Sequence, residues 1–150
     1  LGELFVFVFF GLVAVMGTTY VQTLTLPLLA LLGGVASGLL SVAILVVNNL
    51  RDIPTDRLSG KHTLAVRLGD PATRNLYTAA ILLPFVCAIA MAVSHRGALL
   101  ALIALIAAVA PIRIVRSGSS GRDLIPALAG TGRLLLLYAL LLSAGLVVFG

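Results

Sequence analysis

The chain has 150 residues, of which 61% are hydrophobic and only 10% are charged. Its apolar runs are too long and too numerous for one soluble core, so the composition excludes a soluble domain and predicts an integral membrane protein. The formal net charge is +5, and in a membrane protein the position of the basic residues says more than their number. We expect a lipid bilayer among its partners and no nucleic acid.

Five stretches are long and apolar enough to cross a bilayer, which takes about 20 residues of α-helix. They are rich in Leu, Ala and Val and lack the alternating pattern of membrane β-strands, so helices are expected to satisfy the backbone in lipid. The predicted fold class is therefore all-α, a polytopic transmembrane helix bundle. The predicted spans are residues 4–21, 27–47, 72–93, 97–112 and 124–149.

The first two spans carry few polar landmarks. The first has no basic region before it and no small-residue cleavage site, so it is interpreted as a genuine span and not as a signal peptide. Pro27 is expected in the first turn of the second span, where its missing N–H costs little. Gly34 and Gly38 form a small-xxx-small pair, which predicts close helix packing.

The third span has a clear start signal, because Asp70 can cap a helix and Pro71 suits its first position. Pro84 is expected to bend this span, since it removes one backbone hydrogen bond. Cys87 is the only cysteine and is interpreted as a small buried apolar side chain. Residues 117–121 form a flexible Ser-Gly turn between the last two spans.

The basic residues are unevenly distributed between the loops. Nine of the ten Lys and Arg residues lie after the second and fourth predicted spans or close by, and only Arg96 lies after the first or third. Orientation in membranes follows this bias. We therefore expect the two basic loops to face the cytoplasm, across the cytoplasmic membrane, with the N-terminus inside and the C-terminus outside.

The segment 48–74 interrupts the apolar sequence and holds eight of the fifteen charged residues. Asn48, Asp52 and Asp56 follow i, i+4, i+8 spacing, which places them on one stripe of a continuous helix. Pro54 lies between the two acids, and it disfavours a helical residue before it. The helix is therefore expected to kink or end there, so the sequence alone does not decide whether the two acids share a face.

Two carboxylates beside several cations at a membrane surface suit a divalent metal and the diphosphate bound to it. Mg²⁺ prefers hard oxygen ligands and bridges carboxylates to substrate phosphates. Asp52 and Asp56 are therefore the predicted metal ligands and catalytic residues, and a turn at Ser59 and Gly60 could fold the next residue back toward them. The other predicted diphosphate-site residues are Arg51, Lys61, Arg67, Asn48 and Asn49.

Simpler, non-catalytic interpretations of these residues are also possible. The basic residues of an ordinary loop fix topology, and its acids simply pair with them. The sequence from Gly60 to Thr63 is not a P-loop, because the required Gly and Ser or Thr positions are occupied by other residues. His62 is either a proton carrier or phosphate donor, or a polar residue of the interface. Arg133 either snorkels to the surface or faces the same cavity.

The runs Asn48–Asp56 and Gly60–Gly69 closely resemble the second aspartate-rich motif of UbiA-type membrane prenyltransferases. Within that family they are most similar to the members that act on 1,4-dihydroxy-2-naphthoate in menaquinone biosynthesis. The resemblance implies about nine spans around a central cavity, with two aspartate-rich motifs facing the cytoplasm. Residues 1–150 are then expected to be the C-terminal portion of one transmembrane prenyltransferase domain, with the last five spans.

The resemblance also implies an activity, the Mg²⁺-dependent transfer of a polyprenyl group from polyprenyl diphosphate to 1,4-dihydroxy-2-naphthoate. Diphosphate and CO₂ are lost and demethylmenaquinone results. Asp52 and Asp56 match the acidic positions of the motif, and Arg51 and Lys61 match its basic positions. The first motif is not found upstream, so we expect this chain to be incomplete and inactive alone.

Three alternative functions compete with this one. The acceptor could be another aromatic compound such as 4-hydroxybenzoate or homogentisate, or a porphyrin-type alcohol. The chain could instead be a truncated, non-catalytic membrane module. A solute carrier is disfavoured, because the first four spans contain no charge at mid-membrane depth.

Overall fold

The computed structural model describes residues 1–149, and within them every regular element is helical. Five segments are long and apolar enough to cross a membrane, which confirms the predicted all-α bundle and its five spans. The elements are α1 (Gly2–Val6), η1 (Phe7–Val13), α2 (Ala14–Thr23), α3 (Leu28–Leu58), α4 (Leu64–Leu68), α5 (Asp70–Ala92), η2 (Arg96–Ala104), α6 (Leu105–Arg116), η3 (Gly121–Leu124) and α7 (Ile125–Phe149).

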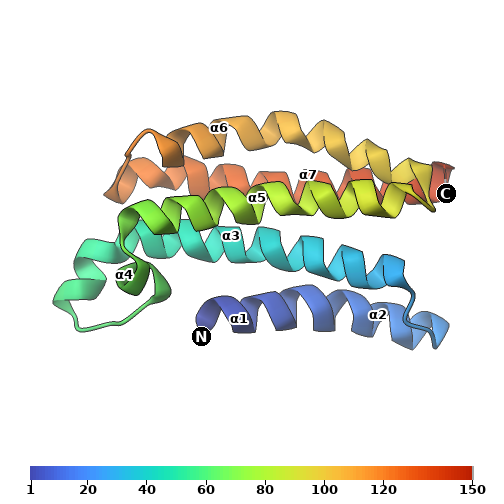
Figure 1. Ribbon diagram of the computed structural model, residues 1–150, viewed down its shortest axis with the longest axis horizontal. Helices are drawn as coiled ribbons and strands as arrows, with labels where there is room; N and C mark the ends of the chain where they lie inside the picture. Colours follow the sequence, from blue (N-terminus) through green and yellow to red (C-terminus); the bar gives the residue numbers. More distant parts are fainter. Residues whose placement is uncertain (150) are drawn as a thin grey trace.

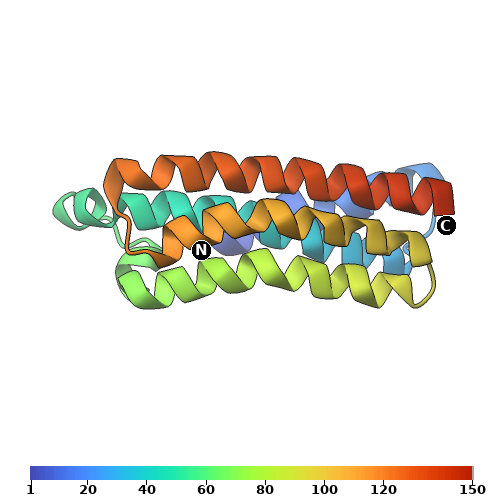
Figure 2. The same ribbon diagram turned by 90° about the horizontal axis from the view of Figure 1, so that it is seen from above.

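The five spans lie side by side along the long axis of the molecule (Figures 1 and 2). The first span, made of α1, η1 and α2, lies along one side of α3, and α5, α6 and α7 lie on the other side (Figure 1). The loop around α4 and the connection from α6 to α7 lie at the same end of the bundle. We call this the motif end. The two basic loops therefore share one end, as the charge distribution predicts.

The helix α3 is the centre of the bundle, because it contacts the first span, α5 and α7. Its buried residues are small or branched apolar side chains such as Ala36, Leu40 and Val47. Gly34 and Gly38 lie directly against the first span, and a Cβ on Gly38 would come within 2.9 Å of the Phe7 carbonyl oxygen. The predicted close packing at this glycine pair is confirmed. The segment of the first span that makes this contact, η1, is a π-helix.

The sequence-based expectation for Pro54 is wrong where it ends the helix, since α3 continues as far as Leu58. Pro54 is exposed near the end of α3, beyond the buried part of the bundle. The next residue is Thr55, whose hydroxyl donates to the Asp52 carbonyl at 2.9 Å. The proline therefore lies where the missing backbone bond is tolerated, near the helix end and outside the buried part of the bundle.

Two further helix starts differ from the prediction by one residue. Pro27 is the N-cap of α3 and not a residue of its first turn. Gly69, with φ of +78°, is the N-cap of α5, so Asp70 is the first helical residue. The Asp70 carboxylate does not cap the helix because it accepts two hydrogen bonds from Arg74, at 2.6 and 2.7 Å.

The Arg74 side chain ties three parts of the motif end together. Besides the Asp70 carboxylate, its guanidinium donates to the backbone carbonyls of Val115 and Ser119. Arg74 is 8% exposed, so it is a buried cation, and its hydrogen bonds go to protein atoms. Arg74 therefore joins the start of α5 to the end of α6, and we refer to these contacts as the Arg74 clamp.

Candidate metal and diphosphate site at the motif end

The last three turns of α3 carry the predicted motif. Because α3 is continuous through Pro54, Asn48, Asp52 and Asp56 lie on one stripe, each about 6 Å further along the axis. The Asp52 side chain is 32% exposed and the Asp56 side chain is 9% exposed. The two carboxylates therefore lie at the boundary between the apolar bundle and the loop at its end, where they are partly enclosed.

Each carboxylate is paired with one of the predicted basic residues. Arg51 binds Asp52 with both arms of its fork, at 2.7 and 2.9 Å. The Lys61 ammonium lies 3.6 Å from the Asp56 carboxylate. The predicted turn is present, because Gly60 adopts φ of +70° and the Lys61 amide donates to the Asp56 carbonyl at 2.9 Å.

These pairs match both interpretations of the segment, since acids that pair with loop cations look the same before a ligand arrives. Arg51 is 30% exposed and Lys61 is 70% exposed at the side chain. Exposed ion pairs contribute about 0–1 kcal/mol. The exposed Arg51–Asp52 pair can therefore open at little cost in stability. Lys61 would leave a buried Asp56 carboxylate, so its move to a phosphate needs a metal ion or another cation to replace it.

Asn48 and Asn49 point to different surroundings. Asn48 lines an apolar cavity between the first span, α3 and α7. The Asn49 amide donates to the Glu3 carboxylate of α1 at 3.0 Å. Glu3 is a residue that the sequence reasoning did not select, although its isolated charge at the start of an apolar span was a visible signal.

His62, Arg67 and Arg133 are all exposed, but they lie in different parts of the structure. His62 is exposed and lines a polar cavity of about 450 Å³ together with Glu3, Asn49 and Lys61. Arg67 is exposed on α4 and takes part in none of the ion pairs found in residues 1–149, so its role toward diphosphate stays a prediction. Arg133 is exposed on α7, away from the buried side of that helix.

The donor set determines which kind of metal could bind. Within residues 1–149 no group of three or more His, Cys, Asp or Glu side chains lies close enough to enclose a metal ion. Mg²⁺, however, is commonly held by one or two carboxylates, with substrate phosphates and waters as the other ligands. Asp52 and Asp56, with the Asn48 oxygen on the same stripe, fit a metal shared with a diphosphate and not an enclosed structural metal.

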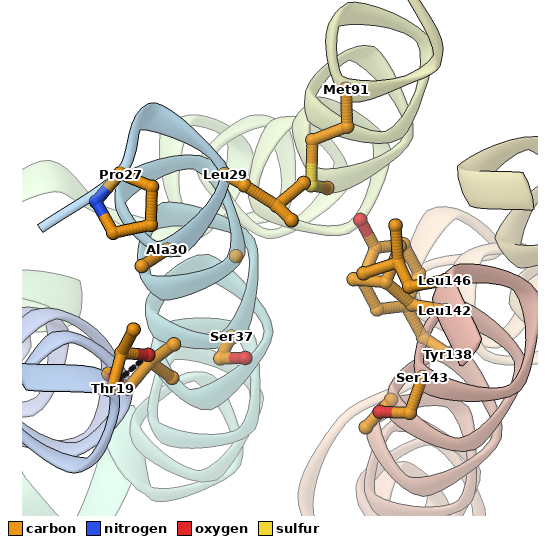
Figure 3. Close-up of a pocket in the computed structure, with 13 residues that line it drawn as sticks. Thr19, Pro27, Leu29, Ala30, Ser37, Met91, Tyr138, Leu142, Ser143 and Leu146 are labelled. Carbon is orange, nitrogen blue, oxygen red and sulfur yellow. Dashed lines mark hydrogen bonds between the residues drawn. The ribbon is translucent and has the colours of Figure 1, made fainter. Parts of the chain in front are cut away.

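Two apolar cavities follow α3 away from the motif. The inner cavity has a volume of about 560 Å³. The outer cavity, of about 370 Å³, is shown in Figure 3, where Ser37 of α3 and Ser143 of α7 point toward the space between the helices. The inner cavity is lined by Val6, Phe10, Ser41, Ile44, Leu45, Asn48, Leu128 and Leu135.

The two cavities lie in sequence along the first span, α3 and α7, and Met91 of α5 also lines the outer one. From the motif end outward, the lining residues run from Val6 to Thr19 in the first span and from Leu128 to Leu146 in α7. On α3 they run from Asn48 back to Pro27, a distance of about 30 Å along the helix. We call this the α3 groove. The α3 groove is the row of these two cavities: α3 lines both, and the inner one includes Asn48 of the aspartate stripe.

Comparison with known proteins agrees with this architecture. Residues 1–123 match the UbiA prenyltransferase family. The chain belongs to this family of membrane proteins, as the motif between Asn48 and Gly69 predicts. No solved structure matches the chain.

Curated relatives carry a more specific name. The chain is 47% identical, over 99% of its length, to the 1,4-dihydroxy-2-naphthoate octaprenyltransferase of Mycobacterium tuberculosis, and it covers 51% of that protein. It is 38% identical, also over 99% of its length, to the Haemophilus influenzae protein of the same name and covers 49% of it. A human relative, UbiA prenyltransferase domain-containing protein 1, is 33% identical over 62% of the chain and 30% of the relative. The chain thus spans about half the length of the bacterial relatives.

Proposed function

We propose that the protein to which this chain belongs transfers a polyprenyl group from polyprenyl diphosphate to 1,4-dihydroxy-2-naphthoate. The observation that carries the proposal is the junction of a two-carboxylate stripe, flanked by Arg51 and Lys61, with the α3 groove. Such a junction suits a substrate with a charged head and a long apolar tail. The names of the bacterial relatives support the choice of acceptor.

In this proposal the chain supplies one of two aspartate-rich motifs of a nine-span domain, as its C-terminal five spans. Asp52 and Asp56 would hold Mg²⁺, with Asn48 as a neutral oxygen ligand. When bound, the metal offsets the negative charge that develops on the departing diphosphate. The half-length coverage of the relatives supports this division of the site.

The basic residues of the motif then have a defined task. Arg51 and Lys61 would turn from the carboxylates to the diphosphate oxygens, Arg51 through its planar fork and Lys61 as a point charge. Donors aimed at the leaving group stabilise the transition state more than the ground state. Lys61 follows a turn at Gly60 and is well exposed, so it has room to follow the substrate.

The α3 groove would hold the prenyl tail and keep water from the reacting carbon. The bond between the allylic carbon and the diphosphate oxygen breaks with its electron pair on oxygen, and the aromatic ring forms a new carbon–carbon bond. The ring carboxylate leaves as CO₂, so the first product is the hydroquinone form of demethylmenaquinone. We further propose that the motif end faces the cytoplasm, because nine of ten basic residues lie in or near its loops.

The test is an acceptor competition with the complete protein in native-like membranes. A labelled polyprenyl diphosphate is offered with Mg²⁺ and either 1,4-dihydroxy-2-naphthoate, 4-hydroxybenzoate or homogentisate. The proposal expects a labelled lipid and released CO₂ only with the naphthoate. Product formation only with another acceptor would move the protein to a different branch of the family. No product with any acceptor would favour a non-catalytic membrane module.

A further inference from the structure

Glu3 is an unusual residue for its position. It lies in the first turn of the first span, beside the cavity that Asn49, Lys61 and His62 also line, and its side chain is only 12% exposed. Placing a carboxylate in such surroundings costs free energy unless a partner satisfies it. Its Oε2 lies 3.9 Å from the Leu1 ammonium, and its Oε1 accepts a hydrogen bond at 3.0 Å from Nδ2 of Asn49, 46 residues later in the chain.

The chemistry of this pair defines the orientation of Asn49. An ionised carboxylate only accepts hydrogen bonds, whereas a carboxamide has a donor side and an acceptor side. Glu3 therefore selects the Asn49 nitrogen and directs the Asn49 oxygen elsewhere. The two residues share a cavity with Lys61, which in turn lies 3.6 Å from Asp56.

We propose that Glu3 is a positioning residue of the motif, which holds Asn49 so that its carboxamide oxygen is presented to the cation side of the Asp52–Asp56 site. Without Glu3 the carboxamide can turn over and present its N–H₂ donors, which repel a metal ion or the Lys61 ammonium. The inference rests on the proposed function, since it concerns the same site. It extends that site to the first span, outside the aspartate-rich segment.

The experiment uses the complete protein in detergent or nanodiscs and follows binding of Mn²⁺, with inorganic diphosphate present, by electron paramagnetic resonance. Groups that orient a metal ligand typically change metal affinity by about 10–100-fold when removed. Glu3→Ala should weaken Mn²⁺ binding by about tenfold. The thermal midpoint, measured without metal, reports separately on a purely structural effect.

An exchanged pair provides the decisive variant. In Glu3→Gln with Asn49→Asp, the new glutamine amide can donate to the new aspartate, which restores the hydrogen bond and still presents an oxygen. Mn²⁺ affinity should return to within about threefold of the wild type, whereas Asn49→Asp alone brings two carboxylates together and should not. Asp123→Asn is the matched control, because it removes an exposed acid from η3 at the same end of the bundle.

The outcomes separate the inference from the proposed function. Weaker Mn²⁺ binding in Glu3→Ala, recovery in the exchanged pair and no change in Asp123→Asn support it. Unchanged binding in Glu3→Ala, or no recovery in the exchanged pair, overturns the role of Glu3, while loss of binding in Asp56→Asn keeps the proposed metal site. Unchanged binding in both Glu3→Ala and Asp56→Asn overturns the site and the inference together.

Discussion

Two clusters of acidic and basic side chains lie within the same polar segment, and they differ in how completely their charges are satisfied. In the motif cluster, Arg51 and Lys61 are 30% and 70% exposed and each holds one carboxylate. In the Arg74 clamp, the cation is 8% exposed and binds one carboxylate and two backbone carbonyls. The same residue types therefore serve two purposes.

The difference lies in what each cation would lose by moving. Arg74 has three protein partners on two connected elements, so releasing it would leave a buried charge and two carbonyls without donors. Arg51 and Lys61 are more exposed, so either can turn to a phosphate, although the Asp56 carboxylate that Lys61 leaves is 6% exposed and needs another cation. The Arg74 clamp therefore holds the motif end together, and we propose that the motif cluster binds a ligand.

The largest expected effect tests the motif cluster. Asp52→Asn or Asp56→Asn in the complete protein should lower turnover by about a thousandfold, because an amide is a much weaker ligand for a hard cation. Prenyl transfer in membranes measures the effect, and immunoblotting of the membrane fraction checks insertion. Asp123→Asn should retain wild-type activity. Wild-type turnover in both motif variants would contradict the proposal that the motif cluster, unlike the Arg74 clamp, binds a ligand.

The next effect tests the Arg74 clamp. Arg74→Ala should lower the free energy of unfolding by about 3 kcal/mol, since it leaves the Val115 and Ser119 carbonyls without donors and the half-exposed Asp70 carboxylate without its cation. Thermal or denaturant unfolding of the purified protein measures this. Arg74→Lys should recover only part of the loss, because an ammonium cannot reproduce the planar fork.

The Arg74 variants also sharpen the comparison through their activity. Arg74 has no part in the proposed ligand site, so the turnover of the folded fraction should stay near the wild-type value. A large loss of turnover with normal stability would instead place Arg74 with the motif cluster.

A third prediction concerns the α3 groove. Ser37→Phe should partly fill the outer cavity, which Ser37 lines. We expect about a tenfold lower kcat/KM for long prenyl diphosphates and little change for a short one that stays in the inner cavity. Val86→Phe is a matched control of the same size, because Val86 is 59% exposed on the outside of α5. Equal losses for both chain lengths would argue against a tail in the groove.

The smallest effect tests a buried contact far from both charge clusters. The Tyr138 hydroxyl donates to the Pro84 carbonyl at 2.7 Å, in the interior of the bundle. Tyr138→Phe should lower the free energy of unfolding by about 1 kcal/mol, the usual net contribution of one hydrogen bond. The unfolding midpoint, measured beside that of Arg74→Ala, would rank the two contacts.

Much of this molecule follows from local properties of the sequence. The five spans follow from the length of the apolar runs, and the aspartate stripe follows from the i, i+4, i+8 spacing of Asn48, Asp52 and Asp56. The turn that returns Lys61 to Asp56 follows from Gly60, which tolerates positive φ. Proline was the weakest local signal. Pro54 disfavours a helix, yet α3 continues through it.

The tertiary structure alone decided which partners meet. The spacing of Glu3 and Asn49 contains no hint of their hydrogen bond, which exists because the first span packs antiparallel on α3. Arg74 resembles the other loop arginines in sequence, and only the neighbouring end of α6 makes it a buried clamp. The α3 groove likewise depends on three elements at once. Periodicity determines which face a residue occupies within its own helix, whereas the packing of helices determines what lies opposite that face.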